Sequence, residues 1–495
     1  MSPARRAEVI VVGGGPAGSA LAWRLASRGL RPLVLERARF PREKVCGDYV
    51  DPRGLHILEA MGCLGRLERS HPPAISHTTT FVEWRPRYSG PIAFYGHGGP
   101  LPPHGYTIPR EELDAAMVDA AVAAGAILHD ETAVIDVEAG AGGVEVTAEH
   151  GGDTVRYSAR LIVGADGANS VVARSQGAAI ADPRRTVLAQ RAYAVTAGAS
   201  AWPGETEVYF NENLFPGYGW VFPATGGRVN LGIGLLDETR RRLRVNIPAL
   251  FGQFVDGLRR CHPSCTGLEL SSKPIGGIVK TYGAAGPNHF AGGLLIGDAG
   301  GFVNPMTGDG ITPGMESALL AARTVESALE AGDVSAGRLS SYERAFRAYF
   351  DPSMVFFDLC AAMLRNRHLA RPWLKALARG CELAQADTGF ARTTGSFFGG
   401  LEVHSSEIIA RVWLAVAEDL LLAWPRAFSG SGTRPRATAP GDVVEWQMAM
   451  ARSAVTDPLW HLRWSIDVQQ LFSRVMSTAA RAPGDPRAGG LLHGR

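Results

Sequence analysis

The stretch that decides the fold is EVIVVGGGPAGSALAWRLASRG, residues 8–29. Residues 8–12 are short and β-branched and end at a glycine, which is typical of a buried parallel strand. Residues 16–29 carry apolar residues at helical spacing and end at Gly29, so they predict a helix. PLVLE at 32–36 predicts a second strand, and the three pieces together predict a βαβ unit.

The turn between the first strand and the helix contains Gly13, Gly15 and Gly18 in the spacing G-x-G-x-x-G. The first glycine permits a tight turn, and the second lets the backbone approach a pyrophosphate. The third lets the helix pack closely on the strand. Pro16 and Ala17 begin the helix, whose N-terminal amides are donors for phosphate oxygens. The motif indicates that a dinucleotide binds at this turn.

Two residues at the end of the second strand belong to the same predicted site. Glu36 is placed to accept hydrogen bonds from ribose hydroxyls, and Arg37 follows it directly. A glycine-rich turn can form without any ligand. The strand, the helix and Glu36 together favour a dinucleotide site.

Bulk properties limit the classes of function. The chain has 495 residues, 46% of them hydrophobic and 20% charged, so it should be globular with more than one module. A net charge of +2 argues against nucleic acid as a partner. The six cysteines are scattered, and the N-terminus lacks a signal-peptide pattern, so we expect a cytoplasmic protein. No apolar run is long enough to span a membrane. Peripheral membrane contact stays open, and the sequence does not indicate an oligomeric state.

The rest of the chain divides into a strand-rich and a helical part. Residues 110–125 predict a helix, and three alternating segments after it predict an antiparallel meander that returns to the main sheet. Residues 180–285 are rich in strands, and about 312–331 predict a long helix. Further segments, in chain order, are an amphipathic helix at 405–424, a linker or mobile loop at 428–441, a final helical pair and a disordered tail.

The predicted fold class is α/β, with a Rossmann-like dinucleotide-binding domain, an inserted antiparallel-sheet substrate domain and a helical C-terminal region. The dinucleotide-binding domain is expected in three parts, at 1–75, 106–180 and 286–335. The substrate domain is expected at 76–105 and 181–285. The helical region is expected at 336–480, and the tail at 481–495.

Two further motifs point to a particular family. LIVGADGANSVVAR at 161–174 carries Asp166, and LLIGDAGGFVNPMTGDGITPGMESA at 294–318 carries Asp298. With the glycine motif, in this order, they resemble the para-hydroxybenzoate hydroxylase-type flavoproteins over roughly residues 8–325. The resemblance implies FAD, with its ribityl chain on Asp298 and its pyrimidine edge on the backbone around Gly310 and Ile311. It also implies that Arg110 contacts FAD.

Simpler roles exist for two of these residues. Asp166 lies in an Asp-Gly pair that favours a turn, so its role could be architectural. Arg110 begins a predicted helix, so the alternative is a solvated arginine at the helix start.

Two more segments resemble the geranylgeranyl reductase branch of these flavoproteins. They are FPREKVCGDYVDPRGLHIL at 40–58 and NLFPGYGWVFPATGGRVNLGIGLL at 213–236. The residues that match the branch's Lys-x-Cys-Gly segment and its aromatic signature are Lys44, Cys46, Gly47, Tyr218, Trp220, Phe222 and Pro223. The chain departs from that pattern in two places, since Phe215 stands where the signature begins with proline and Tyr49 follows Asp48. The departures, and about 80 additional residues, leave the substrate open.

The resemblance implies reduction of a carbon–carbon double bond. Such a reduction needs a hydride on one carbon and a proton on the other, which makes Cys46 and Tyr218 candidate acids. The faces of Tyr218 and Trp220 would stabilise positive charge that develops on carbon. The alternatives are that Cys46 is a small buried hydrophobic residue and that the two aromatic residues are only cavity wall.

Three functions remain open on the sequence. The first is an FAD-dependent reductase of an isoprenoid or other lipophilic small molecule. The second is an FAD monooxygenase that hydroxylates or epoxidises a lipophilic secondary metabolite, which needs a dry pocket. The third is a cyclase or binding protein that keeps FAD mainly as structure. No second dinucleotide motif occurs, so the electron donor is expected to be transient NAD(P)H, another reductase or a ferredoxin.

Overall fold

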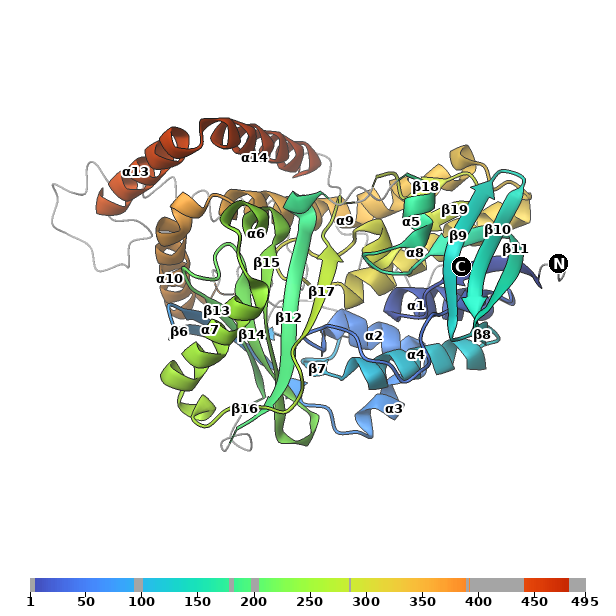
Figure 1. Cartoon of the computed structure of the whole chain (residues 1–495), viewed down its shortest axis with the longest axis horizontal. Coiled ribbons are helices and arrows are strands. Elements are labelled where there is room, and N and C mark those ends of the chain that lie inside the picture. Colours follow the sequence, from blue (N-terminus) through green and yellow to red (C-terminus); the bar gives the residue numbers. More distant parts are fainter. Residues whose placement is uncertain are drawn as a thin grey trace.

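The computed structural model describes residues 5–92, 101–177, 182–196, 204–284, 286–388, 391 and 440–479. It has two large sheets that lie side by side, with helices α13 and α14 along the upper edge of the view (Figure 1). We call the sheet that contains β1 (Arg5–Val12) the first sheet. The sheet that contains β12 (Thr186–Val195) is the second sheet.

The first sheet has the predicted parallel centre, with strand order β18-β19-β11-β1-β2-β8. β1 pairs in parallel with β2 (Leu33–Leu35) and with the end of β11 (Asp153–Gly164). The meander is also confirmed, since β9, β10 and β11 pair antiparallel before β11 returns to β1. The remaining bounds are β8 (Ile127–His129), β9 (Thr132–Gly140), β10 (Gly143–His150), β18 (His289–Phe290) and β19 (Gly293–Leu295).

Both faces of β1 are buried, as its sequence predicts. Val9 and Val11 pack against α1 (Pro16–Ala26), α4 (Arg110–Ala123) and α8 (Ile311–Ala331). Ile10 and Val12 face the other way, toward the meander and α5 (Val171–Ser175). This two-sided cover is what makes a continuous apolar run stable as a parallel strand.

The second sheet has the order β16-β12-β15-β14-β13-β5-β6, with β17 also paired to β12. It is antiparallel except where β13 pairs in parallel with β5, a strand that comes from the segment before α4. That long separation along the chain leaves room for the crossover that a parallel pair needs. The bounds are β5 (His77–Val82), β6 (Arg85–Pro91), β13 (Glu205–Phe210), β14 (Tyr218–Ala224), β15 (Arg228–Leu236), β16 (Glu269–Leu270) and β17 (Ile275–Lys280).

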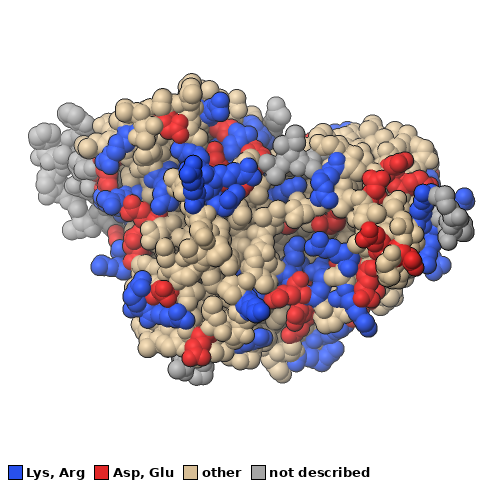
Figure 2. All heavy atoms as spheres, in the orientation of Figure 1, with Lys and Arg blue, Asp and Glu red and all other residues tan. Residues whose placement is uncertain are grey.

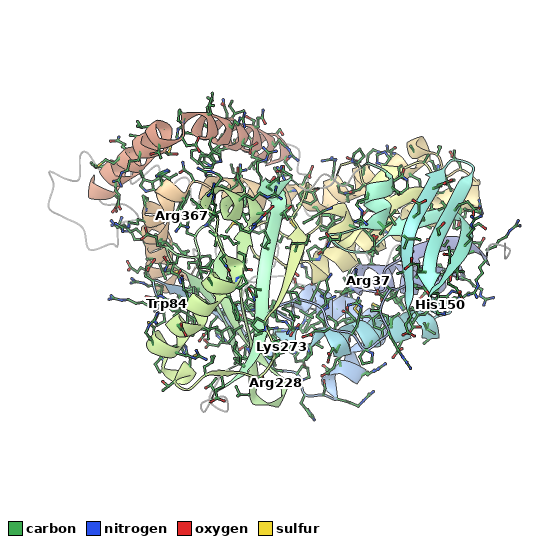
Figure 3. All side chains as sticks on the ribbon, in the orientation of Figure 1. Arg37, Trp84, His150, Arg228, Lys273 and Arg367 are labelled. Atoms are coloured by element: carbon green, nitrogen blue, oxygen red, sulfur yellow. The ribbon has the colours of Figure 1, made fainter. Side chains whose placement is uncertain are left out.

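A helix covers one face of the second sheet and leaves the other face toward the first sheet. α7 (Ile247–Cys261) buries Phe251, Phe254 and Leu258 against the side chains of β15. Trp84, which Figure 3 labels, stacks on Phe254, and their ring centroids are 5.8 Å apart. Because one face is filled by this core, the opposite face is available to line a site.

A small third sheet and short helices connect the two large sheets. Its strands run in the order β3-β7-β4. The bounds of these connecting elements are β3 (Tyr49–Val50), β4 (Ala74–Ile75), β7 (Gly105–Thr107), α2 (Pro52–Ala60), α3 (Leu64–Glu68) and α6 (Asp237–Leu243).

The C-terminal part is helical, as predicted. Its described helices are α9 (Ala336–Leu364), α10 (Ala370–Ala386), α13 (Pro440–Thr456) and α14 (Pro458–Ala479). α13 and α14 are the predicted final helical pair. The helix expected at 405–424 and the tail at 481–495 lie outside the described residues. So does most of the expected linker at 428–441, whose last two residues belong to α13.

The fold class is therefore the predicted one, a Rossmann-like domain with an inserted sheet and a helical C-terminal region. The predicted domain boundaries remain predictions, although the segment at 76–105 does contribute β5 and β6 to the second sheet. Among the described helices, none combines the length and the apolar character required to cross a membrane.

Candidate functional site

A cavity of about 580 Å³ lies between the two large sheets. Residues that directly follow β1, β2, β11 and β19 line it, so it lies at the carboxyl ends of the parallel strands, where α/β sheets bind ligands. The cavity brings together nearly every residue that the sequence predicts for the site, from five separate segments of the chain. Those that line it are Gly13, Gly15, Pro16, Ala17, Glu36, Arg37, Cys46, Arg110, Asp166, Tyr218, Trp220, Asp298, Gly310 and Ile311.

The one predicted residue outside the cavity is Gly18, and its position explains why it is glycine. A Cβ atom there would lie 1.9 Å from the carbonyl oxygen of Gly13. Gly13 itself has a φ of +100°, which residues with a side chain rarely adopt. Gly15 lines the cavity, and a Cβ atom there would meet only the tip of Arg42. Gly13 and Gly18 therefore have the backbone geometry that the motif predicts, and the approach of a pyrophosphate at Gly15 stays a prediction.

Glu36 ties the glycine turn to the end of β2. Its two carboxylate oxygens accept hydrogen bonds from the backbone N–H groups of Gly14, at 2.8 Å, and Ala38, at 3.0 Å. The side chain is buried and lines the cavity beside Arg37, which Figure 3 labels on the side of the first sheet. Glu36 therefore has a structural role at the turn, and its contact with a ribose stays a prediction.

Asp166 has the architectural role that its Asp-Gly pair suggested. One of its two carboxylate oxygens has no hydrogen-bond partner among the described residues. The other accepts from the backbone N–H of Val171, at 2.6 Å, at the start of α5. The oxygen without a partner is Oδ1, and it is buried. A buried polar atom of this kind costs free energy unless something binds it.

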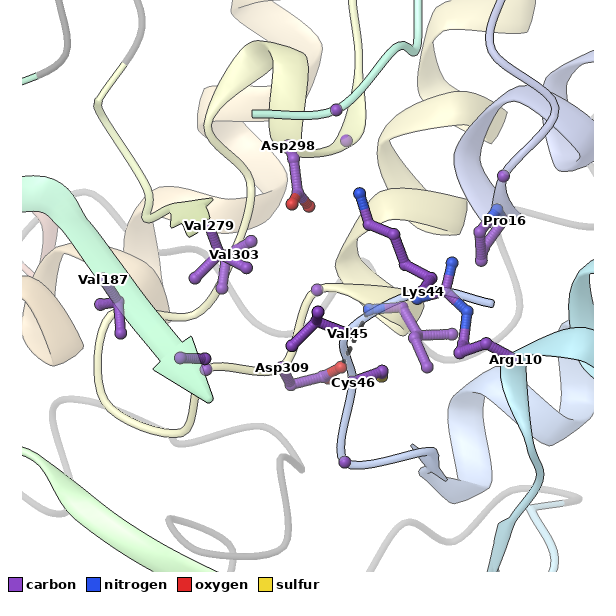
Figure 4. Close-up of a pocket in the computed structure, with 18 of the residues that line it drawn as sticks. Pro16, Lys44, Val45, Cys46, Arg110, Val187, Val279, Asp298, Val303 and Asp309 are labelled. Carbon is purple, nitrogen blue, oxygen red and sulfur yellow. Dashed lines mark hydrogen bonds between the residues drawn. The ribbon is translucent and has the colours of Figure 1, made fainter. Parts of the chain in front are cut away.

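Charges of both signs meet at one end of the cavity. Lys44 extends into the space between Asp298 and Pro16 (Figure 4). Burial raises the pKa of the Asp298 carboxyl, an effect that the positive charges of Lys44 and Arg110 oppose. Burial likewise lowers the pKa of the Lys44 ammonium. Lys44 was not among the predicted site residues, although it stands in the Lys-x-Cys-Gly segment.

Arg110 is held in place by an acidic neighbour on its own helix. Its guanidinium donates two hydrogen bonds to Asp114, at 2.8 and 2.9 Å. It also donates toward the thiol of Cys46. Burial lowers the pKa of the Arg110 guanidinium, but the contacts with Asp114 and Cys46 outweigh this effect and leave the pKa above its ordinary value. Arg110 is thus a fixed, buried cation at the cavity and not a solvated residue at a helix start.

Two helix N-termini open on the same cavity. α1 begins at Pro16, and α8 begins at Ile311 after Gly310. Each presents backbone N–H groups and a partial positive charge. Together with Lys44, they fit a phosphate-bearing dinucleotide, and the unpartnered oxygen of Asp166 can accept a hydrogen bond from a hydroxyl of the same ligand.

The Cys46–Asp48 turn is fixed by a buried polar network. Asn230 donates to the Cys46 carbonyl at 2.8 Å and to the Asp48 carboxylate at 2.7 Å, and Tyr193 also donates to Asp48. Trp220 donates from its indole nitrogen to Asn230 at 3.0 Å. Burial raises the pKa of Asp48 to about 6, against the effect of the hydrogen bonds from Tyr193 and Asn230.

The two candidate acids, Cys46 and Tyr218, differ in the hydrogen bonds that their protons make. Burial is the main cause that raises the pKa of the Cys46 thiol, and Arg110 opposes it, so the thiol is the neutral form at pH 7. The Tyr218 hydroxyl donates to the carbonyl of Thr307, and burial raises its pKa as well. That bond ties β14 to the loop before α8.

The sequence did not single out Asp309, which lines the cavity between Tyr218 and α8. Its carboxylate accepts from the backbone N–H of Ile311 at 3.1 Å. Burial, and then the negative charge of Asp51, raise the pKa of Asp309 to about 8. The only signal in the sequence was its position, directly before Gly310 at the start of a predicted helix. Nothing in the sequence shows that Asp51 lies nearby.

Comparisons with known proteins agree with this site. A family model described as an FAD binding domain matches residues 6–223. Menaquinone reductase of Mycolicibacterium smegmatis is 36% identical over 340 residues, which cover 65% of this chain and 77% of that protein. Digeranylgeranylglycerophospholipid reductase 2 of Methanopyrus kandleri is 30% identical and covers 70% of this chain and 84% of that protein.

A solved structure has the same fold. It is a geranylgeranyl bacteriochlorophyll reductase-like protein from Thermoplasma acidophilum, with a TM-score of 0.63 and 23% identity over 74% of this chain and 88% of that one. The cavity, the family model and the reductase relatives agree with one another. The chain therefore belongs to the geranylgeranyl reductase family of FAD-dependent oxidoreductases.

Proposed function

We propose that this enzyme reduces carbon–carbon double bonds in an isoprenoid chain or another lipophilic substrate. The observation that carries the proposal is the continuity of the cavity, which runs from the glycine turn to an apolar and aromatic wall. The names of its relatives, menaquinone reductase and digeranylgeranylglycerophospholipid reductase, support a lipophilic substrate.

The cofactor end of the cavity is proposed to hold FAD. The α1 N-terminus and Lys44 would bind the pyrophosphate, Asp298 the ribityl chain, and the backbone at Gly310 and Ile311 the flavin. When bound and reduced, FAD supplies a hydride to the substrate. The electron donor that reduces it is proposed to be NAD(P)H, another reductase or a ferredoxin, acting transiently.

The other end of the cavity is suited to an apolar chain. Side chains from the second sheet, from the loop before α8 and from α9 line it, and most are aliphatic or aromatic: Val187, Ala189, Val208, Phe210, Tyr218, Trp220, Phe222, Leu235, Val279, Met306, Ala361 and Leu364. An apolar lining excludes water, which favours a lipophilic substrate and disfavours competing reactions at the reduced cofactor.

Two groups can supply the proton that the second carbon needs. Cys46 and Asp309 both line the cavity, and both are neutral acids at pH 7 because burial raises the pKa of each. The proton of Tyr218 is engaged with Thr307, so we propose Tyr218 and Trp220 as wall residues whose faces stabilise charge on carbon. Asp309 is the stronger acid of the pair, with a pKa of about 8.

The test is a single-turnover reaction in the absence of oxygen. The flavin is reduced with dithionite, a geranylgeranyl lipid or menaquinone is added, and the products are weighed by mass spectrometry. A gain of two hydrogens per bond is the expected result. The reaction is then repeated in air, where a gain of one oxygen would instead establish a monooxygenase. An unchanged mass with altered retention would establish a non-redox role.

Variants separate the two acids. Loss of the group that delivers the proton should slow the reduction about 100-fold or more. We expect this effect in either Cys46→Ala or Asp309→Asn, with FAD content unchanged. Cys261→Ala and Asp256→Asn, at exposed positions on α7, are the matched controls. Full activity in both cavity variants would remove Cys46 and Asp309 from this role.

A further inference from the structure

The outward face of α13 and α14 is unusually apolar. Six large hydrophobic side chains lie on it, each between 45% and 84% exposed, and Val455 is the most exposed of them. We call these six the outer ridge: Val444, Met448, Val455, Leu459, Leu462 and Ile466. They recur three, four or seven residues apart within each helix, so in each helix they form one stripe.

The ridge is long and lies at the edge of the molecule. α13 has 17 residues and α14 has 22, which correspond to about 25 and 33 Å of helix at 1.5 Å per residue. The two helices run in succession along the upper edge (Figure 1), and few charged side chains lie along that edge in the space-filling view, where all uncharged residues are tan (Figure 2). Contiguous exposed apolar surface of this kind marks an interaction site.

The inward faces of the same helices are fully used. Ala449 and Trp464 are buried in a cluster with Leu369, and other tryptophans pack around them. Trp464 donates from its indole nitrogen to the carbonyl of Ala362 in α9 at 2.7 Å. The outer ridge is therefore not an inner face that has been displaced from the core.

The acidic and the basic residues of these two helices differ in their partners. The four acidic residues of 440–479 all pair with basic residues of the body of the protein: Asp442 with Arg379, Glu445 with Lys375, Asp457 with Arg242, and Asp467 with Arg184 and Arg365. The three basic residues of the same segment, Arg452, Arg463 and Arg474, are exposed instead. No ion pair between described residues includes any of the three.

We propose that the outer ridge and its three arginines form a docking surface for a lipid bilayer with anionic headgroups. An apolar stripe flanked by arginines is how an amphipathic helix lies in a membrane interface. A second copy of the chain fits less well, because a two-fold contact sets the same patch against itself and would bring like charges together.

The α14 part of the ridge lies on the far side of α9 from the cavity. α14 packs on α9, and Ala361 and Leu364 of α9 line the cavity beside the residue that Trp464 contacts. A docked bilayer would thus lie next to the wall where a lipophilic substrate binds. This supply of substrate rests on the proposed function, whereas docking itself does not.

The test is co-sedimentation of the full FAD-loaded chain with vesicles of phosphatidylcholine that contain phosphatidylglycerol. We expect binding that weakens in high salt and on vesicles of phosphatidylcholine alone. The variant Val455→Asp/Leu459→Asp should bind at least about tenfold less, because it places charge in the apolar interface. Each of Arg452→Ser and Arg463→Ser should weaken binding about fivefold.

The matched control is Val122→Asp, on the exposed face of α4, which should bind as the parent does. Absence of binding by the parent chain would overturn the proposal, as would full binding by the double variant. If the parent chain is a dimer that does not bind vesicles, and the double variant is a monomer, the ridge is assigned to a second copy. That result would also overturn the proposal. Should the double variant lose FAD or unfold early, the arginine variants decide.

Vesicle binding needs no turnover, so a failed reductase assay leaves this result intact. With substrate dispersed in detergent, the double variant should retain the parent rate. With substrate embedded in the vesicles, the rate of the double variant should fall by the same factor as its binding to the vesicles. Equal loss in both assays would contradict delivery from the bilayer.

Discussion

The two ends of the cavity are built in different ways. At the cofactor end, a backbone framework shapes the site, namely a glycine turn and two helix N-termini, and buried charged side chains such as Glu36 and Lys44 complete it. At the substrate end, side chains make it, and they come from strands of the second sheet and from α9. A backbone site tolerates almost no change, whereas a wall of side chains can be altered residue by residue. The difference implies that cofactor and substrate preference can be changed independently.

The sharpest way to break this comparison is at Gly18. Gly18→Ala places a Cβ atom 1.9 Å from the Gly13 carbonyl oxygen, and this oxygen cannot turn aside as a flexible side chain could because it belongs to the backbone. We expect a loss of about 3 kcal/mol or more in the free energy of unfolding, and little bound FAD. Flavin absorbance and chemical unfolding measure both effects.

Its control is Gly252→Ala in α7, an exposed helical glycine where a Cβ atom would meet nothing within 4 Å. That variant should gain about 0.5–1 kcal/mol, because alanine is the better helix former. If Gly18→Ala kept its FAD and its stability, the cofactor end would not be fixed by the backbone.

Between the two ends, Asp309 should give the protein a distinctive pH dependence. Its pKa is raised to about 8, so the folded protein keeps a proton there that the unfolded chain releases near pH 4. The stability that this proton contributes is present below pH 4 and is lost as the pH rises toward 8. Asp309→Asn removes the titration.

The difference in unfolding free energy between the parent and Asp309→Asn should therefore fall by at most about 1.4 kcal/mol per pH unit across that window. Denaturant unfolding at several pH values measures it, with Asp256→Asn as the exposed control. A difference that is constant from pH 4 to 8 would mean that Asp309 titrates normally.

The smallest expected effect is at the substrate end. Trp220→Phe keeps an aromatic wall but leaves Asn230 without the indole donor at 3.0 Å. We expect a loss of about 1 kcal/mol in stability, unchanged FAD content and a higher KM for the lipophilic substrate. Trp373→Phe is the control, because the indole nitrogen of Trp373 has no hydrogen-bond partner among the described residues. Loss of FAD from Trp220→Phe would show that the two ends are not independent.

The same contrast decides what the sequence could predict. The first strand, helix and second strand form a local unit, and the roles of Gly13, Gly15 and Gly18 follow from residues a few positions apart. The buried network at Asp48 is different, since Tyr193 and Asn230 are 145 and 182 residues away along the chain. They meet Asp48 only through the arrangement of the second sheet, which no local pattern determines.

Asp309 and the outer ridge were missed for related reasons. The pKa of Asp309 depends on Asp51, which reaches it only because α2 packs on α8. The helical character of 440–479 was predictable. Which face turns outward depends on contacts with α9 and α10 that are not visible in the periodicity, because both faces carry apolar residues.

α9 separates the cavity from α14, so its two sides have different neighbours. Ala361 and Leu364 set the depth of the cavity, while the carbonyl of Ala362, in the same helical turn, anchors Trp464 of α14. A bulkier residue in this turn would shorten the space for a substrate chain, and one that tilted the helix would also move the outer surface. One helical turn of α9 therefore links the depth of the cavity to the position of the outer ridge.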